Sequence, residues 1–400
     1  MGEVICFTGA TLLAGDDLRV TSGPALVAQA GRILEIGAPA PAVRQVDLSG
    51  QLLCPMFINA HTHVGDTGAK ELGVGLPLEK VVVPPDGLKH RFLQTVQGTP
   101  GHVAMMRHGL LEMLHNGIIA LADFREQGLP GVRALREAAA GLPLRVMALG
   151  RMAETHSADQ VEAEAHALLQ EADGLGVRDV EAYPAEVLKR LRAAYPHKLF
   201  AAHAAESEAS EMRSRRQTGR GQPARLLDWQ PDFLVHLVHA STEELRRLAD
   251  LGTFGVACPR CNGLLGTGQP RLAEWARCGL RFGLGTDNVM FSSPDMLREM
   301  DFASRLVRGQ EREAAALDPR RLLQAATLDG ARALSLEKEL GSLSPGKEAS
   351  FIAFDLRSLN LKYQQDVISA VVHRATPADI AGIYVKGEAV VIQEKQAASR

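Results

Sequence analysis

Residues 55–66 read PMFINAHTHVGD and place two histidines, His61 and His63, on either side of one threonine. The apolar run at 56–58 is typical of a buried strand, and the glycine and aspartate that follow the histidines mark its end. Side chains two residues apart in a strand point to the same face, so both imidazoles should project together at the end of this strand. The pair is therefore a candidate metal-binding element.

The composition indicates an ordinary soluble globular protein. A chain of 400 residues with 46% hydrophobic and 23% charged residues can form one large domain with a smaller companion. The net charge of −3 disfavours binding to nucleic acid or to a membrane surface. Five scattered cysteines favour a reducing compartment over a disulfide framework. With no N-terminal signal sequence and no apolar run of about 20 residues, the expected location is the cytoplasm.

Brief apolar runs alternate with helical stretches through the middle of the chain. Helices are predicted at 101–117 and 157–174, where apolar residues recur at helical spacing. Counting the strand that ends at His61, the eight predicted strands include runs at 118–124, 144–150, 179–183, 198–204, 233–240, 254–259 and 281–287. Eight such strand–helix units predict an α/β fold, a (β/α)₈ TIM barrel.

Short strands with turn residues return at both ends of the chain. They fill roughly the first 50 residues and reappear at 349–356 and 380–393, where Lys386 and Gly387 form a predicted hairpin turn. We therefore expect a small β-sandwich built from both chain ends. The predicted domains are residues 1–53 and 345–400 for the sandwich and residues 54–344 for the barrel.

Further ligand-type residues follow other predicted strands. His203 and Glu206 end the fifth strand, His236 ends the sixth and Asp287 ends the eighth. The carboxyl ends of barrel strands form the active-site face, so these side chains are expected to meet the histidine pair. Three imidazoles and one carboxylate suit Zn²⁺ or Fe²⁺, and such a metal lowers the pKa of a bound water to about 7. A remaining carboxylate, Glu206, is then free to carry protons.

Several motifs together resemble those of the amidohydrolase superfamily, in particular the branch of cytosine, guanine and S-adenosylhomocysteine deaminases and triazine hydrolases. PMFINAHTH resembles PGFVNAHTH, HAAE resembles HxxE, VHLVH resembles AHCVH and GLGTDN contains GTD. Further on, AATLDGARALSL resembles ATxxGAxALGL, and LGSLSPGKEASFIAFD resembles IGSLxPGKxADLVVxD. The similarity extends over almost the whole chain.

The resemblance implies a function for each of these residues. One divalent metal, Zn²⁺ or Fe²⁺, would be bound by His61, His63, His203 and Asp287. Glu206 would protonate a substrate ring nitrogen and pass protons to the leaving group, and His236 would hydrogen-bond the attacking hydroxide or the reacting centre. Asp287 would also accept the proton of the metal-bound water as it attacks. The implied reaction is deamination of a purine, pyrimidine, pterin or similar N-heterocycle.

Two stretches depart from that branch. The motif ACPRCN has Ala257 in place of a histidine and Cys261 in place of a serine, and residues 64–91 differ from the usual sequence after the histidine pair. Loops at this face select substrates, so candidate substrate contacts come from such loops. They are Asp66, Lys70, Arg125 and Arg260. The cluster Lys89, His90 and Arg91 is expected to be a solvated face or to meet an anionic substrate group.

Other functions remain open from the sequence. Hydrolysis of a cyclic amide or of a carbon–chlorine bond is one alternative, and a non-catalytic scaffold is another. Relatives that open rings with two metals use a carboxylated lysine on the fourth strand, whereas GLGVRDVEAY contains no lysine, which favours one metal. The CPRC motif has no second CxxC that would complete a structural zinc site. The resemblance also leaves a homo-oligomer open.

Overall fold

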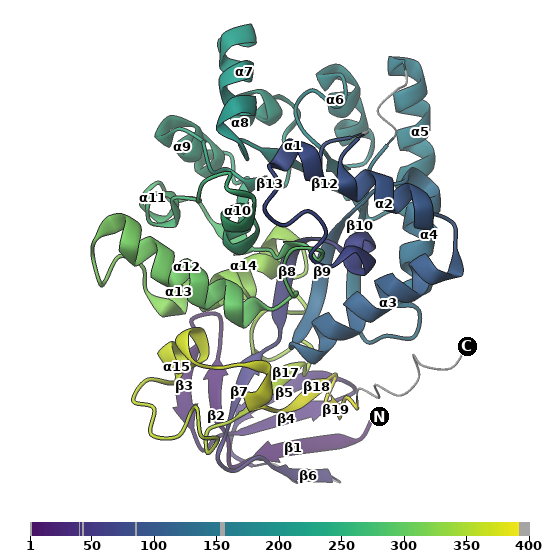
Figure 1. The fold of residues 1–400 in the computed structure, drawn as a ribbon. Helices are drawn as coiled ribbons and strands as arrows, with labels where there is room; N and C mark the ends of the chain where they lie inside the picture. The colour runs from purple at the N-terminus through teal and green to yellow at the C-terminus, as the bar shows by residue number, and fades with distance from the viewer. Residues whose placement is uncertain (1, 40, 42–43, 85, 153–156, 392–400) are drawn as a thin grey trace.

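The computed structural model describes residues 2–39, 41, 44–84, 86–152 and 157–391. It contains a large α/β part and a smaller β-rich part (Figure 1). The purple N-terminal strands and the yellow C-terminal strands lie together at the base of the molecule, below the α/β part. The two ends of the chain thus share one layer, as the short strands at both ends predicted.

The α/β part is built on a parallel sheet of nine strands in the order β15-β14-β13-β12-β11-β10-β9-β8-β16. Their bounds are β8 Phe57–His63, β9 Ile118–Arg125, β10 Arg145–Gly150, β11 Gly174–Val177, β12 Leu199–Ala204, β13 Phe233–His236, β14 Phe254–Ala257, β15 Phe282–Leu284 and β16 Asp287–Asn288. Only two residues separate β15 from β16, yet β15 pairs with β14 and β16 pairs with β8. The sheet is therefore strongly curled, and β15 also contacts β8.

Helices surround this sheet (Figure 1). Their bounds are α1 Leu78–Val81, α2 Leu88–Val96, α3 Pro100–His115, α4 Gly128–Ala139, α5 Ala158–Glu171, α6 Ala185–Ala194, α7 Glu208–Thr218, α8 Gln222–Leu226, α9 Thr242–Asp250, α10 Pro259–Leu265, α11 Leu272–Arg277, α12 Met296–Glu311, α13 Pro319–Ala325 and α14 Leu328–Ala333. The predicted helices at 101–117 and 157–174 are α3 and α5. Capping explains where they begin, because the side chains of Thr99 and Ser157 accept hydrogen bonds from the first turns.

Among the described residues, no helix combines the length and apolar character that crossing a bilayer requires.

The fourth strand lies elsewhere than predicted. The sequence pattern predicted it at 179–183, but these residues form a loop with turns and bends, and the strand is β11, Gly174–Val177. The prediction was wrong because two glycines interrupt the apolar pattern of GLGV. Both are required by close packing: a Cβ on Gly174 would lie 1.9 Å from the backbone oxygen of Leu199, and one on Gly176 would lie 2.7 Å from the ring of Phe124.

The β-rich part consists of two sheets, β5-β4-β1-β6 and β19-β18-β17-β7-β2-β3. The bounds are β1 Val4–Thr8, β2 Thr11–Ala14, β3 Arg19–Ser22, β4 Ala25–Gln29, β5 Arg32–Gly37, β6 Arg44–Asp47, β7 Gln51–Pro55, β17 Phe351–Asp355, β18 Ile380–Val385 and β19 Glu388–Ala389. Phe7 and Leu26 of the first sheet share a buried cluster with Leu12, Leu53 and Phe351 of the second. The helix α15, Val367–His373, contacts α12 and α13.

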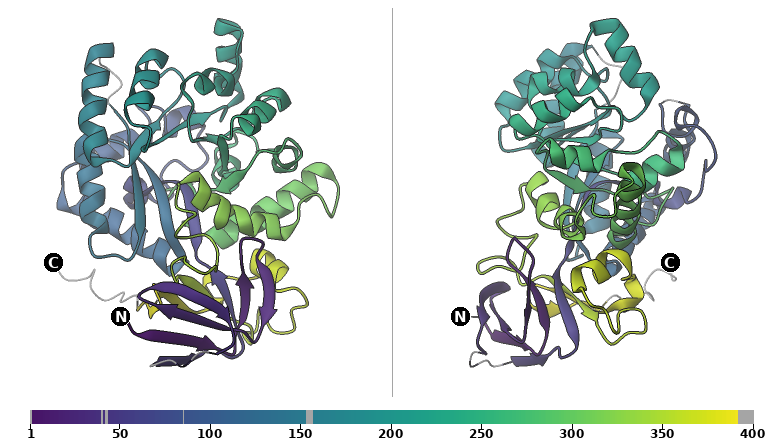
Figure 2. Two further views of the ribbon diagram at one scale, coloured as in Figure 1. Left: turned by 180° about the vertical axis from the view of Figure 1, so that it is seen from behind. Right: turned by 90° about the vertical axis from the view of Figure 1, so that its left-hand side faces the viewer.

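The junction between the two parts lies directly before the histidine pair. The predicted domain boundary between residues 53 and 54 falls within β7, and Met56 alone separates β7 from β8. Figure 2 shows the β-rich part below the α/β part from two further directions. The predicted hairpin turn is confirmed, because Val385 pairs with Glu388 and both intervening residues have positive φ. The β-rich part therefore anchors the start of the strand that carries the histidines.

We predict that Gly174→Ala destabilises the protein, because its Cβ would meet a backbone oxygen that cannot move without breaking the β11–β12 pairing. Overpacking of this kind costs about 1–3 kcal/mol. The matched control is Gly309→Ala in α12, where nothing lies within 4 Å and alanine should stabilise the helix by about 0.5–1 kcal/mol. Urea denaturation measures both. Equal stabilities of the two variants would contradict the packing seen at β11.

Candidate functional site

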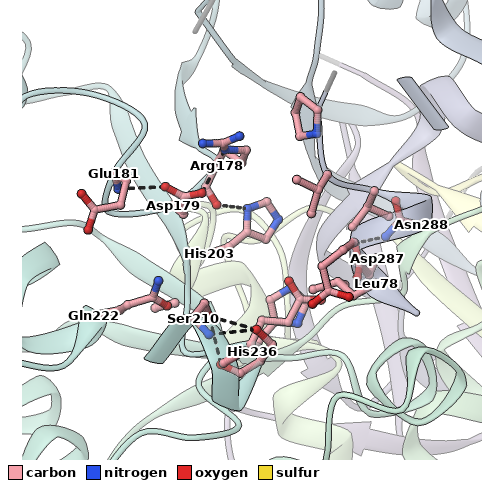
Figure 3. A pocket seen from close by; sticks show the side chains of 18 of the residues that line it. Leu78, Arg178, Asp179, Glu181, His203, Ser210, Gln222, His236, Asp287 and Asn288 are labelled. Atoms are coloured by element: carbon pink, nitrogen blue, oxygen red, sulfur yellow. Dashed lines mark hydrogen bonds and ion pairs between the residues drawn. The ribbon is translucent and has the colours of Figure 1, made fainter. Parts of the chain in front are cut away.

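The predicted ligand residues converge at the carboxyl ends of the parallel strands. His61 and His63 end β8, His203 lies near the end of β12, His236 ends β13 and Asp287 begins β16. The Nε2 atom of His61 lies 3.2 Å from Asp287 Oδ1 and 3.3 Å from His203 Nε2, and His63 Nε2 lies 3.4 Å from the same Asp287 oxygen. Figure 3 shows His203, His236 and Asp287 pointing into one pocket. The structure thus brings together all five residues.

The backbone turns sharply where these side chains enter the pocket. Ala205, His236, Leu237 and Asp287 all have positive φ, at 49°, 74°, 49° and 57°. Such conformations cost about 1–3 kcal/mol each for residues other than glycine and persist only where the surroundings enforce them. Strain of this kind is concentrated at functional sites, and here it directs His236 and Asp287 toward the histidine pair.

The hydrogen bonds of the histidines show which ring nitrogens face the centre as acceptors. His63 Nδ1 lies 3.1 Å from the carbonyl oxygen of Phe124 and 2.9 Å from Glu126 Oε1, and His203 Nδ1 lies 2.9 Å from the carbonyl oxygen of Arg178. Because these oxygens only accept, both Nδ1 atoms carry the proton. Burial lowers the pKa of His63 to about 3, with a further contribution from Lys89, so its ring is neutral.

The Nε2 atoms of the histidines and a carboxylate oxygen of Asp287 face one another at the centre of the cluster. The unprotonated Nε2 of His63 faces a carboxylate oxygen of Asp287, and the unprotonated Nε2 of His203 faces His61 Nε2. Burial opposes ionisation of Asp287, but its hydrogen bond to His61 and the surrounding histidines hold its pKa well below the usual range. Lone pairs and a negative charge that converge in a buried site repel unless a cation lies between them. The residues present therefore fit a divalent metal.

Glu206 and His236 lie beside this cluster as a second pair. His236 Nε2 is 3.6 Å from Glu206 Oε2, and His236 Nδ1 is 3.1 Å from the side-chain nitrogen of Asn262. With that amide donating, the imidazole proton is on Nε2 and points toward Glu206. Burial raises the pKa of Glu206 to about 8, and the nearby charge of Asp287 adds to the effect. Glu206 therefore holds a proton at neutral pH.

The pocket above these groups has a volume of about 310 Å³. Figure 3 shows Arg178, Asp179 and Glu181 on one side and Asp287 and Asn288 on the other. Its apolar wall comes from the segment around α1, from the end of β12 and from α7, with Leu78, Val82, Val83, Pro84, Ala204 and Ala209 as lining residues. Its other polar lining includes Lys89, Arg151, Gln222, Ser207 and Ser210. This mixture suits a small molecule with one flat apolar face and several polar edges.

The four candidate substrate contacts have other partners. Asp66 is buried, accepts a hydrogen bond from the Met290 backbone and lies 3.5 Å from Lys89. Arg125 is fully buried against Asp123 and Glu126. Lys70 pairs with Glu112 on the surface, at 2.9 Å.

Arg260 pairs with Glu299 at 3.3 Å and donates to the carbonyl oxygen of Ser293. None of the four candidates is among the described residues that line the pocket.

Sequence reasoning missed residues that support the ligands. Glu126 contacts His63, Asn288 donates to Asp287 Oδ1 at 2.8 Å, and Asn262 contacts His236. Lys89, expected on a solvated face or at an anionic group, is buried and lines the pocket. A signal for Glu126 was present, because charged residues at the end of an otherwise apolar strand, as in ADFRE, need buried partners.

Neither the neighbouring His239 nor the CPRC motif takes part in the ligand cluster. The His239 Nε2 atom lies 2.7 Å from the carbonyl oxygen of Thr267. Cys258 and Cys261 are buried free thiols. Within the described part of the chain, the groups able to share an ion contain histidines and Asp287 but no cysteine.

Comparison with known proteins agrees with this arrangement. The sequence profile of the amidohydrolase family matches residues 52–390. A protein of Methanothermobacter thermautotrophicus that carries a provisional assignment as an aminohydrolase is 32% identical over 95% of this chain and 97% of its own length. The 5-methylthioadenosine/S-adenosylhomocysteine deaminase of Natronomonas pharaonis is 28% identical over 91% of this chain and 86% of its own.

A solved structure shows the same fold at lower identity. The adenosine deaminase of Xanthomonas campestris, described with bound zinc, superimposes with a TM-score of 0.85 at 22% identity, covering 96% of this chain and 92% of that one. The profile match and the full-length relative confirm the resemblance inferred from the motifs: this chain belongs to the amidohydrolase family.

Proposed function

We propose that this amidohydrolase removes an amino group from an N-heterocycle, such as a purine, pyrimidine or pterin, by hydrolysis at a single divalent metal site. His61, His63, His203 and Asp287 would hold the metal. Zn²⁺ is the favoured ion because the structural relative is described with zinc and imidazole is a preferred zinc ligand, and Fe²⁺ is the alternative. The observation that supports this most directly is that the unprotonated Nε2 atoms of His63 and His203 converge with His61 Nε2 and a carboxylate oxygen of Asp287 in one buried cluster.

The metal, when bound, lowers the pKa of water to about 7 and so makes hydroxide available at neutral pH. Asp287 remains ionised, because its pKa lies well below the usual range, and can accept a proton from the attacking water. Glu206 holds its proton near neutral pH and can donate it to a ring nitrogen as negative charge develops there.

The carbon under attack loses its amino group as ammonia once that group has been protonated. After Glu206 has given up its first proton, it can take over the proton that Asp287 accepted from the attacking water. It can then deliver this proton to the leaving nitrogen. His236, with a proton on Nε2 directed into the pocket, can hydrogen-bond the oxygen that adds to the ring. Water and the aminoheterocycle thus become an oxo-heterocycle and ammonia.

In this proposal the whole catalytic set belongs to a (β/α)₈ barrel of residues 54–344, in which β15 and β16 together act as the eighth strand. Their pairing with β14 and β8 supports that assignment. The chain ends, 1–53 and 345–400, would form the β-sandwich, of which residues 392–400 lie outside the described residues. A heterocycle would lie between the histidine cluster and the apolar wall of the α1 segment.

A single metal is favoured over two. No lysine lies on β11, Gly174–Val177, and Arg178 follows it. A carboxylated lysine therefore has no source on the fourth strand. Opening of a cyclic amide by the two-metal reaction is disfavoured for this reason. Removal of chloride needs only one metal and therefore remains a competing reaction.

We predict about one equivalent of divalent metal per chain in the purified protein, and loss of that metal in His203→Ala. Removal of one of four ligands leaves the others unable to hold an ion tightly. The matched control is His239→Ala, whose imidazole contacts a backbone carbonyl outside the cluster and should retain the metal. Elemental analysis measures both. Equal metal content in the two variants would contradict the assigned ligand set.

We predict that Glu206→Gln retains its metal but loses deamination by about 10²–10⁴-fold, because the amide cannot deliver a proton to the ring. The control is Glu208→Gln, an exposed carboxylate two residues away. A panel of aminoheterocycles and chloroheterocycles should be assayed for released ammonia and chloride. Ammonia from wild type supports the proposal; chloride without ammonia would reassign the reaction, and silence across the panel would contradict both.

A further inference from the structure

The least expected group in the pocket is the ammonium of Lys89, in the first turn of α2. Its side chain is 3% exposed, yet it lines the same cavity as His63 and Glu206. A buried ammonium is costly unless anionic and polar groups surround it. The identity of those groups indicates what the lysine does.

One set of contacts leads from Lys89 to His63. Lys89 Nζ lies 2.8 Å from Glu126 Oε1, and the same oxygen lies 2.9 Å from His63 Nδ1. Arg125 and Arg151 also contact Glu126. Glu126, together with the Phe124 carbonyl oxygen that accepts from Nδ1, fixes the tautomer and orientation of the imidazole and leaves the lone pair of Nε2 free. Lys89 and the two arginines hold that carboxylate in place.

A second set of contacts leads from Lys89 to Asp287. Lys89 Nζ donates to Asn288 Oδ1 at 2.7 Å, and Asn288 Nδ2 donates to Asp287 Oδ1 at 2.8 Å. An ammonium can only donate, so it forces the amide oxygen of Asn288 toward itself and the amide nitrogen toward Asp287. Without Lys89, the amide could turn over and present its oxygen to the carboxylate.

We propose that Lys89 is a positioning residue that holds two metal ligands at once, His63 through Glu126 and Asp287 through Asn288. The inference rests on the proposed function, because it requires that these residues bind a metal. It adds a group that belongs to neither the ligands nor the proton-transfer pair. It also connects the metal site to the substrate-facing segment, since Lys89 lies eight residues after α1.

The experiment is a chelator-competition measurement of the metal dissociation constant. It compares wild type, Lys89→Met, Glu126→Gln and the double variant, with Lys80→Met as the control because Lys80 is an exposed lysine on α1. Loss of a group that orients a ligand typically weakens metal binding by about 10–100-fold. Lys89→Met should fall in that range and Lys80→Met should match wild type. The double variant should lose less than the product of the two single losses, because the two substitutions share the path from Lys89 through Glu126 to His63.

A spectroscopic measurement separates positioning from substrate contact. The visible absorption of the Co²⁺-loaded protein reports ligand geometry without any substrate, and it should shift in Lys89→Met but not in Lys80→Met. Wild-type metal affinity and an unchanged spectrum in Lys89→Met would overturn the proposal, even if activity falls, and would assign Lys89 to the substrate. Failure of wild type itself to bind metal would instead refute the proposed function.

The contacts from Lys89 to His63 and to Asp287 can also be tested without removing the lysine. If Lys89→Met does not fold, Glu126→Gln removes the contact to His63 and Asn288→Ala removes the contact to Asp287. Weaker metal binding in at least one of them supports the proposal, and wild-type binding in both overturns it. Unfolding of the metal-free proteins, followed in parallel, distinguishes loss of the metal from loss of the fold.

Discussion

The site depends on one electrostatic constraint: the unprotonated Nε2 atoms of His63 and His203 converge with the carboxylate of Asp287 in one buried cluster. The protein fixes the tautomers of His63 and His203 through acceptors on Nδ1, and so it prevents these rings from relieving the repulsion by sharing a proton. A divalent cation is the group that satisfies all these atoms together. Against the effect of burial, the surrounding histidines keep Asp287 ionised, whereas burial and the nearby charge of Asp287 keep Glu206 protonated. This difference suits the two carboxyl groups to the base and acid roles proposed for them.

The fold meets this constraint by joining distant parts of the chain. The strand that carries the histidine pair begins one residue after a strand of the β-rich part, so the β-rich part fixes the entry of β8. Asp287 reaches the same point because β16 pairs with β8, although more than 200 residues separate them. Positive φ values at His236 and Asp287 show that the backbone itself is bent to bring the side chains together.

Much of this arrangement could be predicted from the sequence. The cluster could be predicted because parallel strands present their carboxyl ends on one face. The residues that mark these strand ends in the sequence are His61, His63, His203, His236 and Asp287. The fourth strand could not be predicted, because its two glycines interrupt the apolar pattern. Glycine is needed there because a larger side chain would collide with the backbone of Leu199 or the ring of Phe124.

The substrate-facing residues were the least predictable part of the site. Arg125 and Asp66 looked available as substrate contacts, but Arg125 is buried against its near neighbours Asp123 and Glu126, and Asp66 lies against Lys89 of α2. Lys89 looked solvated because its partners Glu126 and Asn288 lie far from it in sequence, directly after β9 and in β16. Buried charge networks depend on tertiary contacts, and local sequence contains little information about them.

The most direct test is a crystal structure of the protein loaded with Zn²⁺, with data collected on both sides of the zinc absorption edge. The account predicts one anomalous peak per chain, in contact with His61 Nε2, His63 Nε2, His203 Nε2 and a carboxylate oxygen of Asp287. A peak elsewhere, or no peak at saturating zinc, would contradict it.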